Sequence, residues 1–315
     1  MSENVSKITK AVAFFLLLGV LLAAAGCAPQ RDVRLAGEEA QPFQVTLIDD
    51  LGREVQLDRI PERIVSLAPS NTEMLFALGL DDRIVGVSEH CDYPAAALEK
   101  PKVGTFAEPN LELVVAAEPH LVVAVHLQEE KLTRLAELGI PVLVLSPSSV
   151  AEIYASLELL GEAAQVQENA RAYVAQMQER IQKVSERVAS LPAPKRVYYE
   201  VYADPLMSVG PETVIHELIE IAGGQNIFTD VDTPYPKISA EAVIDRNPEV
   251  IIFPDYHGDE EFMANEIINR PGWQSIYAVQ NERVVGINPD IISRPGPRVV
   301  EAVEQLAAII YPELN

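Results

Sequence analysis

Short apolar runs alternate with helical patterns along most of the chain. Four runs in the first half have the length of buried strands; they are residues 64–67, 84–88, 121–125 and 141–146. Helical patterns separate the later runs, at residues 111–118 and 131–139. Strands that alternate with helices predict a parallel sheet that helices cover on both faces. Residues 43–57 alternate apolar and polar positions around Asp50-Leu51-Gly52, which predicts a β-hairpin ahead of this sheet.

The pattern changes between residues 149 and 190. This segment contains no proline and one glycine, Gly161, and its apolar residues recur at helical spacing. It predicts a long helix that ends at Leu191-Pro192, with a break near Gly161 as the alternative. Strand and helix patterns then resume to the end of the chain. The sequence therefore predicts two Rossmann-like α/β lobes with mostly parallel sheets, residues 43–148 and 192–315, joined by a single long helix at residues 149–191.

One unit of the first lobe has a counterpart in the second. The segment FAEPNLELVVAAEPHLVVA, residues 106–124, aligns without a gap on YPKISAEAVIDRNPEVIIF, residues 235–253. Each unit starts with an aromatic residue, continues through a predicted helix and ends in a predicted strand. The repeat indicates that the two lobes are built alike.

An acid occupies the same position in both copies of the repeat. Glu112 and Glu241 each stand in the first turn of the predicted helix, just after an Asn or Ser suited to the N-cap. For one such glutamate alone, a favourable interaction with the helix dipole is a sufficient explanation. Two in matching positions favour a second interpretation, a pair of acids, one per lobe, on a common face.

The first 26 residues are expected to be a leader rather than part of the fold. Lys7 and Lys10 precede a short apolar run, and small residues lead up to Gly26-Cys27, as in a secretory signal. The ending also resembles a bacterial lipobox, which implies cleavage before Cys27 and lipidation of its thiol. The alternative is an ordinary signal peptide with an incidental cysteine. Residues 27–42 would then be a polar tether that anchors the protein at the extracytoplasmic face of a membrane or in the periplasm.

Charge and cysteine content narrow the classes of partner. The chain has 47 acidic and 24 basic residues, for a net charge of −23 at pH 7. Such a field disfavours general binding to nucleic acid and is compatible with docking on a basic protein surface. Besides Cys27 the chain contains only Cys91, so its stability must come from packed cores rather than a disulfide. Cys91 is expected to be a buried or half-buried free thiol.

Polar and aromatic residues follow several predicted strands. Ligands of open α/β sheets bind beyond the C-terminal ends of the strands, so these residues are candidates for the walls of a binding cleft. They are Pro69, Ser70, Asn71, His90, Cys91, Tyr93, His126, Tyr202, Tyr256, His257, Asp290 and Arg294.

Three of the five histidines are in this set, namely His90, His126 and His257. They are either solvated loop residues or, for one of them, a ligand to the metal of a bound chelate. His216 lies in a helical pattern that lacks the second histidine of an HExxH zinc motif, so it is expected to be structural. His120 precedes a strand and is expected at the opposite edge of the sheet.

Several ordered segments resemble the substrate-binding proteins of ABC importers for vitamin B12 and ferric siderophores, above all the cobalamin-binding proteins. They are RIVSLAPSNTE, GVSEHCDYP, the NLE and SAE helix starts, AGGQNIF and INPDIISRPGPR, and the resemblance covers about residues 43–312. It implies two α/β lobes bridged by one long helix, with the ligand between them. It also implies that Glu112 and Glu241 dock into arginine pockets of a permease dimer, which works with cytoplasmic ATPase subunits.

The resemblance assigns ligand contacts to particular positions. In the cobalamin binders, the positions of His90, Phe106, Met207 and Tyr235 carry aromatic residues that pack on the corrin. The positions of Asp290 and Arg294 face the ligand. This chain departs from that set because His90 replaces an aromatic alcohol and Met207 replaces a ring. Its only tryptophan, Trp273, is expected in the core.

The implied ligand is cobalamin or a related corrinoid, with a ferric siderophore or haem as the alternative. No intrinsic cofactor and no resident metal site are expected, and the protein is expected to be a monomer. A surface-anchored two-lobed enzyme that uses Ser70 or His90 is less favoured, because no G-x-S-x-G, Walker, G-x-G-x-x-G or C-x-x-C pattern occurs. A sensory or adhesive lipoprotein is a third possibility.

Overall fold

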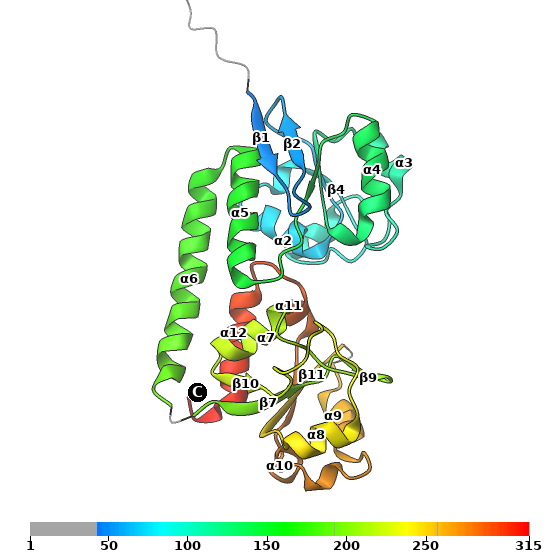
Figure 1. Cartoon of the computed structure of the whole chain (residues 1–315). Coiled ribbons are helices and arrows are strands. Elements are labelled where there is room, and N and C mark those ends of the chain that lie inside the picture. The colour runs from blue at the N-terminus through cyan, green and yellow to red at the C-terminus, as the bar shows by residue number, and fades with distance from the viewer. Residues whose placement is uncertain (1–42, 192, 257, 315) are drawn as a thin grey trace, which may run out of the picture. The chain divides into compact units, whose positions relative to one another are not determined.

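The computed structural model describes residues 43–191, 193–256 and 258–314 (Figure 1). The predicted leader, the tether with Cys27, and His257 lie outside these residues. Within the described ranges, no helix has both the length and the apolar character needed to cross a membrane.

The N-terminal lobe contains a hairpin and a parallel sheet. Strands β1 (Val45–Ile48) and β2 (Glu54–Leu57) pair antiparallel, which confirms the predicted hairpin. Four strands then form a parallel sheet in the order β4-β3-β5-β6. Their bounds are β3 (Ile64–Ser66), β4 (Ile84–Val87), β5 (Leu121–Ala124) and β6 (Val142–Val144). The helices of this lobe are α2 (Pro69–Ala77), α3 (Leu111–Ala116) and α4 (Glu129–Glu137), with short 3-10 turns η1 (Asp81–Arg83), η2 (Ala95–Glu99) and η3 (His126–Gln128).

The C-terminal lobe repeats this strand order. Its parallel sheet runs β10-β7-β11-β12, so in both sheets the first strand in sequence lies between the second and the third. The bounds are β7 (Lys195–Tyr199), β10 (Gly224–Asn226), β11 (Val250–Pro254) and β12 (Val284–Ile287), with a small hairpin of β8 (Tyr202–Ala203) and β9 (Leu206–Met207). The helical elements are α7 (Val214–Ile221), α8 (Ala240–Arg246), α9 (Glu260–Ile268), η4 (Trp273–Ser275), α10 (Tyr277–Gln280), α11 (Pro289–Ser293), α12 (Val299–Ile310) and η5 (Pro312–Leu314).

The sequence repeat corresponds to a structural repeat. Its two copies form α3 followed by β5 and α8 followed by β11, and these strands occupy the same place in their sheets. Both predicted N-caps are confirmed. The side-chain oxygen of Asn110 accepts from the amides of Glu112 and Leu113 at 3.0 and 3.2 Å. The hydroxyl oxygen of Ser239 accepts from the amide of Ala242 at 3.2 Å.

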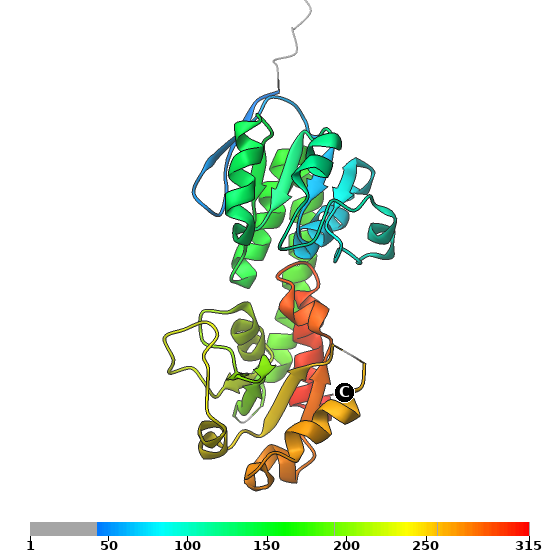
Figure 2. The ribbon, with the colours of Figure 1, turned by 90° about the vertical axis from the view of Figure 1, so that its right-hand side faces the viewer.

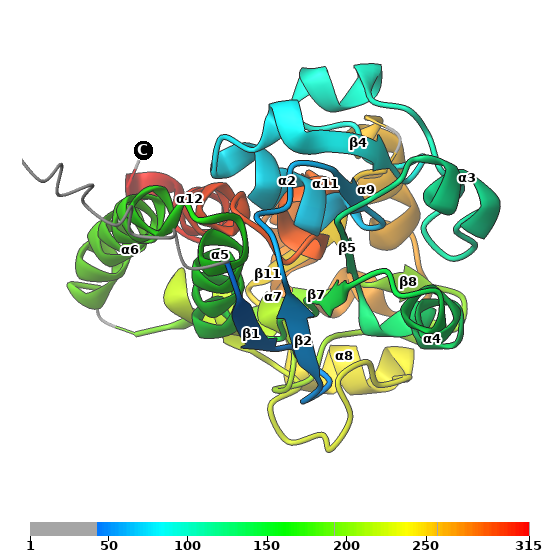
Figure 3. The same ribbon diagram turned by 90° about the horizontal axis from the view of Figure 1, so that it is seen from above.

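The segment between the lobes holds two helices, α5 (Val150–Ala164) and α6 (Gln167–Ala189). They pack along each other, and α6 alone continues to the C-terminal lobe (Figures 1 and 3). The chain reverses at Gln165, whose φ of 57° is left-handed. Gly161 lets the helices approach closely, since a Cβ there would lie 2.6 Å from that of Ala170. One long helix, α6, therefore joins the lobes, as predicted. The alternative of a break near Gly161 is confirmed, because α5 ends at Ala164 and α6 begins at Gln167. The domain boundaries stay a prediction.

One apolar core runs through both lobes. It takes in residues of α2, α5, α6, α7 and α12 and one face of each sheet. A smaller separate core covers the other face of each sheet. Because the largest core is continuous along α6, apolar packing itself holds the lobes together.

Candidate functional site

A cleft of about 570 Å³ lies between the two lobes, inside the range of roughly 300–1,000 Å³ that small-molecule sites occupy. Its lining includes seven of the residues predicted from sequence: Pro69, Ser70, His90, Phe106, His126, Tyr235 and Arg294. The remaining lining residues are Val125, Leu127, Leu145, Ser146, Pro147, Ser293 and Pro295.

The N-terminal wall is built at the C-terminal ends of parallel strands. Pro69 and Ser70 begin α2 directly after β3, and His126 begins η3 directly after β5. Parallel strands all end at one edge of a sheet, so these residues gather there. The amide of His126 donates to the Ser146 hydroxyl at 2.8 Å, which ties the ends of β5 and β6 together.

Phe106 and Tyr235, the first residues of the two repeated units, both line the cleft. Phe106 is half-buried and Tyr235 is exposed. The buried amide of Gln128 holds the Phe106 loop by donating to the carbonyl oxygens of Phe106 and of Leu67. Each lobe thus contributes one aromatic side chain from the same position of its repeat.

Arg294, in the turn after α11, supplies a guanidinium to the cleft. Its Nη1 donates to Asp92 Oδ1 at 2.6 Å and lies 3.4 Å from Glu73 Oε1. Its Nη2 lies 3.3 Å from Asp92 Oδ2 and 2.7 Å from Asp290 Oδ1. This hydrogen bonding holds the pKa of Asp92 below its usual range. Asp290, which the resemblance also places toward the ligand, pairs with Arg294 and is not itself among the lining residues.

A buried ion pair joins the lobes beside the cleft. Arg298, at the start of α12, donates from Nε to Glu73 Oε2 at 2.8 Å and from Nη2 to Oε1 at 2.6 Å. Burial raises the pKa of Glu73, and the two neighbouring guanidiniums oppose that shift. Figure 2 shows the segment that leads into α12 (red) reaching the N-terminal lobe. Gly296 fits this close approach, since a Cβ there would lie 3.3 Å from the carbonyl oxygen of Ser70.

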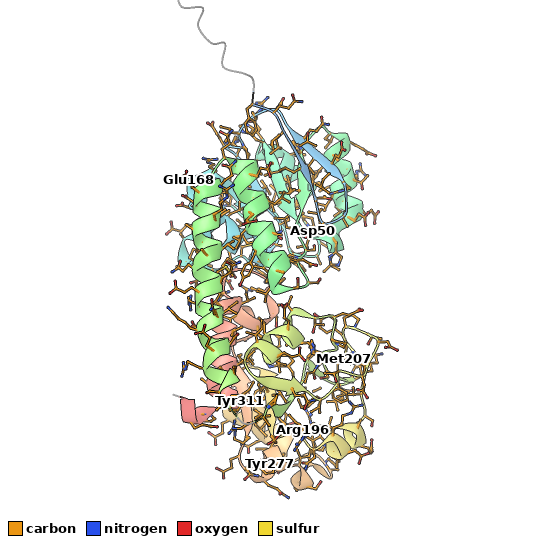
Figure 4. The ribbon with its side chains drawn as sticks, turned by 60° about the vertical axis from the view of Figure 1, so that its left-hand side comes forward. Asp50, Glu168, Arg196, Met207, Tyr277 and Tyr311 are labelled. Carbon is orange, nitrogen blue, oxygen red and sulfur yellow. The ribbon has the colours of Figure 1, made fainter. Side chains whose placement is uncertain are left out.

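Several residues predicted to contact a ligand have other places. Asn71 is fully buried, its amide donates to the carbonyl oxygen of Ala124 at 2.9 Å, and it is not among the residues that line the cleft. The ring of Tyr93 lies 4.0 Å under the guanidinium of Arg298 and belongs to the contact between lobes. Tyr202 and Met207 pair in the β8–β9 hairpin, outside the cleft lining (Figure 4).

Most of the lining residues that sequence reasoning missed lie at the end of a parallel strand or beside a residue that the strand-end rule selected. Leu145, Ser146 and Pro147 directly follow β6, and Ser293 and Pro295 flank Arg294. The residues after the last strand of the N-terminal lobe could have been predicted to line the cleft, because all four parallel strands end at the same edge of the sheet.

The two matched glutamates are exposed in the first turns of α3 and α8. Hydrogen bonds at the start of α8, first at the backbone of Glu241 and then from Ser239, lower the pKa of the Glu241 carboxyl. Figures 1 and 3 show α3 and α8 on the side of the protein away from α6. Each helix therefore presents one carboxylate to solvent, one from each lobe.

The remaining expectations concern residues that do not line the cleft. Trp273 is fully buried in the core of the C-terminal lobe. His216 is buried beside Asn226, and Cys91 is a buried free thiol whose pKa burial raises. His120 accepts from the amide of Glu62 at the N-terminal end of β5. Among the residues that the structure describes, no group of three or more His, Cys, Asp or Glu side chains could hold a metal ion.

Comparison with known proteins identifies the family to which this fold and cleft belong. A family model described as periplasmic binding protein matches residues 64–291. YvrC, an uncharacterized ABC transporter substrate-binding lipoprotein of Bacillus subtilis (strain 168), is 34% identical over 310 residues, 96% of each chain. A vitamin B12-binding protein of Vibrio cholerae serotype O1 is 32% identical over 251 residues, which cover 79% of this chain and 89% of that protein.

A solved structure shows the same fold. The crystal structure of the periplasmic vitamin B12 binding protein BtuF of Vibrio cholerae aligns with a TM-score of 0.71 at 31% identity. The alignment covers 81% of this chain and 99% of that one. The predicted fold class is thereby confirmed. The match over residues 64–291 and the similarity to YvrC over 96% of each chain show that the chain belongs to the periplasmic binding protein family.

Proposed function

We propose that this chain is the substrate-binding protein of an ABC importer and carries cobalamin or a related corrinoid in the cleft between its lobes. The observation that carries the proposal is the matched pair Phe106 and Tyr235, which line one cleft from two lobes. Aromatic side chains contribute large rigid contact areas, which suit a flat macrocycle. The names of the vitamin B12-binding relatives support the same ligand class.

Titration of the purified protein tests this ligand. Calorimetry and absorbance are used with cobalamin, cobinamide, haem and ferric siderophores, and tight binding of a corrinoid is expected. Recovery of the ligand unchanged after incubation would support binding without turnover and count against an enzyme that uses Ser70 or His90. Tight binding of haem or a ferric siderophore with no corrinoid binding would contradict the proposal.

A ferric siderophore or haem is the second candidate, and two imidazoles favour it. His90 and His126 are exposed and line the cleft, where either could coordinate the metal of a bound chelate. The test is the absorption spectrum of bound haem or corrinoid in His90→Ala and His126→Ala. A band shift that one substitution abolishes supports ligation by that residue, and an unchanged spectrum in both variants excludes ligation by either.

Docking on the permease is proposed for Glu112 and Glu241. Their support is the repeated position, their exposure and their location away from α6. Carboxylates pair with arginine in bidentate geometry and speed the encounter of oppositely charged surfaces. A two-fold permease dimer could therefore recognise one carboxylate from each lobe.

Charge reversal tests the docking proposal. Glu112→Arg and Glu241→Arg are expected to leave ligand affinity unchanged and to weaken binding to the reconstituted transporter by about tenfold each. Glu168→Arg is the matched control, since Glu168 also stands in the first turn of a helix but on α6 (Figure 4). Normal transporter binding by the double variant, or an equal loss in the control, would contradict the assignment.

Lipid attachment at Cys27 and a monomeric, extracytoplasmic binding protein complete the proposal. The name of the Bacillus subtilis relative, a lipoprotein, supports the anchor. In cells, Cys27→Ser is expected to move the protein from the membrane to the soluble fraction. If the Cys27→Ser protein remained in the membrane fraction, lipid attachment at Cys27 would not be what anchors it.

A further inference from the structure

Arg294 lines the cleft between the lobes, and its guanidinium already forms salt bridges with carboxylates of the protein. Arg294 is the only arginine or lysine among the described lining residues. Both of its terminal nitrogens contact carboxylates of Asp92, Asp290 or Glu73 at 2.6–3.4 Å. An arginine in this state has no terminal nitrogen left for a bidentate contact with an anionic ligand.

The charges around Arg294 leave a net negative site. Arg298 is held by Glu73 in a bidentate pair, so it does not compensate for the other acids. The cluster then contains three carboxylates, of Glu73, Asp92 and Asp290, and two guanidiniums. Asp92 and Asp290 keep 45% and 38% of their side chains exposed. Neither lines the cleft itself, but both contact Arg294, which does, so their charge acts on an anion that approaches this guanidinium.

We propose that this cleft selects neutral or cationic metal chelates and rejects anionic ones, because Asp92 and Asp290 occupy the guanidinium that an anion would need. The inference rests on the proposed function, a chelate carrier, and narrows its ligand class. Corrinoids with intact side-chain amides and ferric hydroxamates belong to the accepted class. Ferric catecholates and chelates with free carboxylates belong to the rejected class. An anion would have to displace an aspartate from Arg294 or remain beside uncompensated negative charge.

The decisive experiment uses two ligands of equal shape and different charge. These are cyanocobalamin and its derivative in which a side-chain amide is hydrolysed to a carboxylate, titrated at pH 8, where histidine side chains carry little charge. The intact amide form is expected to bind roughly tenfold tighter, since like charges at contact distance repel by about that factor. Equal affinities for the two forms in the wild-type protein would overturn the inference.

Two substitutions should abolish the expected preference. Asp92→Asn and Asp290→Asn each free part of the guanidinium of Arg294, so the carboxylate form should gain roughly tenfold in affinity. The amide form should stay within about threefold. Glu179→Gln on α6 is the control, because it removes one charge from an exposed residue that pairs with Lys183. The two aspartate variants are made separately, so the test survives if one of them folds poorly.

The outcomes separate this inference from the proposed function. If both corrinoids bind and neither aspartate variant changes the ratio of their two affinities, the charge selection is wrong and corrinoid binding stands. If neither corrinoid binds but a neutral or cationic ferric hydroxamate does, the corrinoid proposal is wrong and the charge selection stands. Preferred binding of haem or a ferric catecholate, or binding of no chelate in the panel, would overturn both.

Discussion

The two lobes have the same strand order but contribute different chemistry to the cleft. The N-terminal lobe supplies an apolar wall with two imidazoles, formed by the ends of its parallel strands. The C-terminal lobe supplies Tyr235 and the turn around Arg294, whose guanidinium is bound to acids of both lobes. The repeated topology therefore sets where the cleft lies, and the loops that differ between lobes set what it accepts.

The separate cores of the lobes differ as well. The one in the N-terminal lobe consists of aliphatic residues of β3, β5 and β6 and the helix α4. The one in the C-terminal lobe is built around Tyr198, whose ring meets Phe228 and Trp273 edge to face at 6.1 and 6.0 Å. Glu200 and Arg270 form a salt bridge beside this group, with Arg270 over Trp273. Equal topology thus tolerates different packing, provided that the shared core along α6 persists.

The largest expected effect comes from breaking the ion pair that joins the lobes. Glu73→Gln leaves the buried guanidinium of Arg298 without its charged partner, which should cost about 3–5 kcal/mol of unfolding free energy. Glu304→Gln is the matched control, because Glu304 makes the same bidentate contact to Arg180 with 40% of each side chain exposed. It should cost less than about 1 kcal/mol. Urea denaturation measures both, and equal losses would show that burial of the Glu73 pair is unimportant.

This ion pair marks the limit of what the sequence predicts. Local signals found the strands, the N-caps Asn110 and Ser239 and the repeat, because each depends on neighbouring residues. Glu73 and Arg298 lie far apart in the chain, and nothing near either residue indicates the other. The strand-end rule selected five of the fourteen lining residues, and the resemblance added Phe106 and Tyr235. The rule also selected Asn71, because burial of a polar residue at a strand end depends on how neighbouring loops pack.

The break between α5 and α6 was predicted only as an alternative to one continuous helix, for a different reason. Helical periodicity continues through residues 150–189 without proline, and the reversal at Gln165 uses a left-handed residue that is neither glycine nor asparagine. Gly161 indicated the region of the break, but its physical role is close contact with Ala170 on the next helix. Such tertiary contact is not visible in local propensity.

Two buried asparagines offer a second comparison of the lobes. Asn71 donates to the carbonyl oxygen of Ala124 in the N-terminal lobe, and Asn226 donates to that of Val209 in the C-terminal lobe, both at 2.9 Å. Replacing either by alanine should cost about 1–3 kcal/mol, because a buried side-chain hydrogen bond is lost, although the carbonyl oxygen of Ala124 keeps the amide of Leu145 as a donor. Thermal or urea denaturation measures this loss. Neither substitution should change ligand affinity. A loss of affinity in Asn71→Ala alone would show that Asn71 contributes to ligand binding.

The matched aromatic residues test whether the lobes contribute equally to binding. Phe106→Ala and Tyr235→Ala should each weaken binding of the ligand by about tenfold, or about 1.4 kcal/mol, through lost contact area. Calorimetric titration of both variants gives the comparison. Phe262→Ala serves as the control, since Phe262 is also exposed but absent from the cleft lining. A loss confined to one variant would mean that one lobe alone holds the ring system.

The smallest expected effect is a pH dependence of stability that comes from the contact between Asp92 of one lobe and Arg294 of the other. The pKa of Asp92 is lowered in the folded protein, first by its hydrogen bond from Arg294. A lowered folded pKa stabilises the protein at pH values above the unfolded pKa, and this stability is lost as pH falls through the folded pKa. Because Asp92 is partly exposed, the pair should contribute about 0.2–1 kcal/mol. Wild type should thus exceed Asp92→Asn in unfolding free energy near pH 7, and the difference should shrink as pH falls below the ordinary pKa of an aspartate and through the lowered pKa of Asp92.

The pair Asp230–Arg246 provides the counterpart within one lobe. Its hydrogen bond from Arg246 likewise lowers the pKa of Asp230, so Asp230→Asn should show a pH dependence of the same sign. Of these two acids, only Asp92 bridges the lobes at the cleft, so Asp92→Asn but not Asp230→Asn should also change the ratio of the affinities for amide and carboxylate ligands. If both substitutions altered that ratio, overall charge rather than the contact at Arg294 would govern which chelate the cleft accepts.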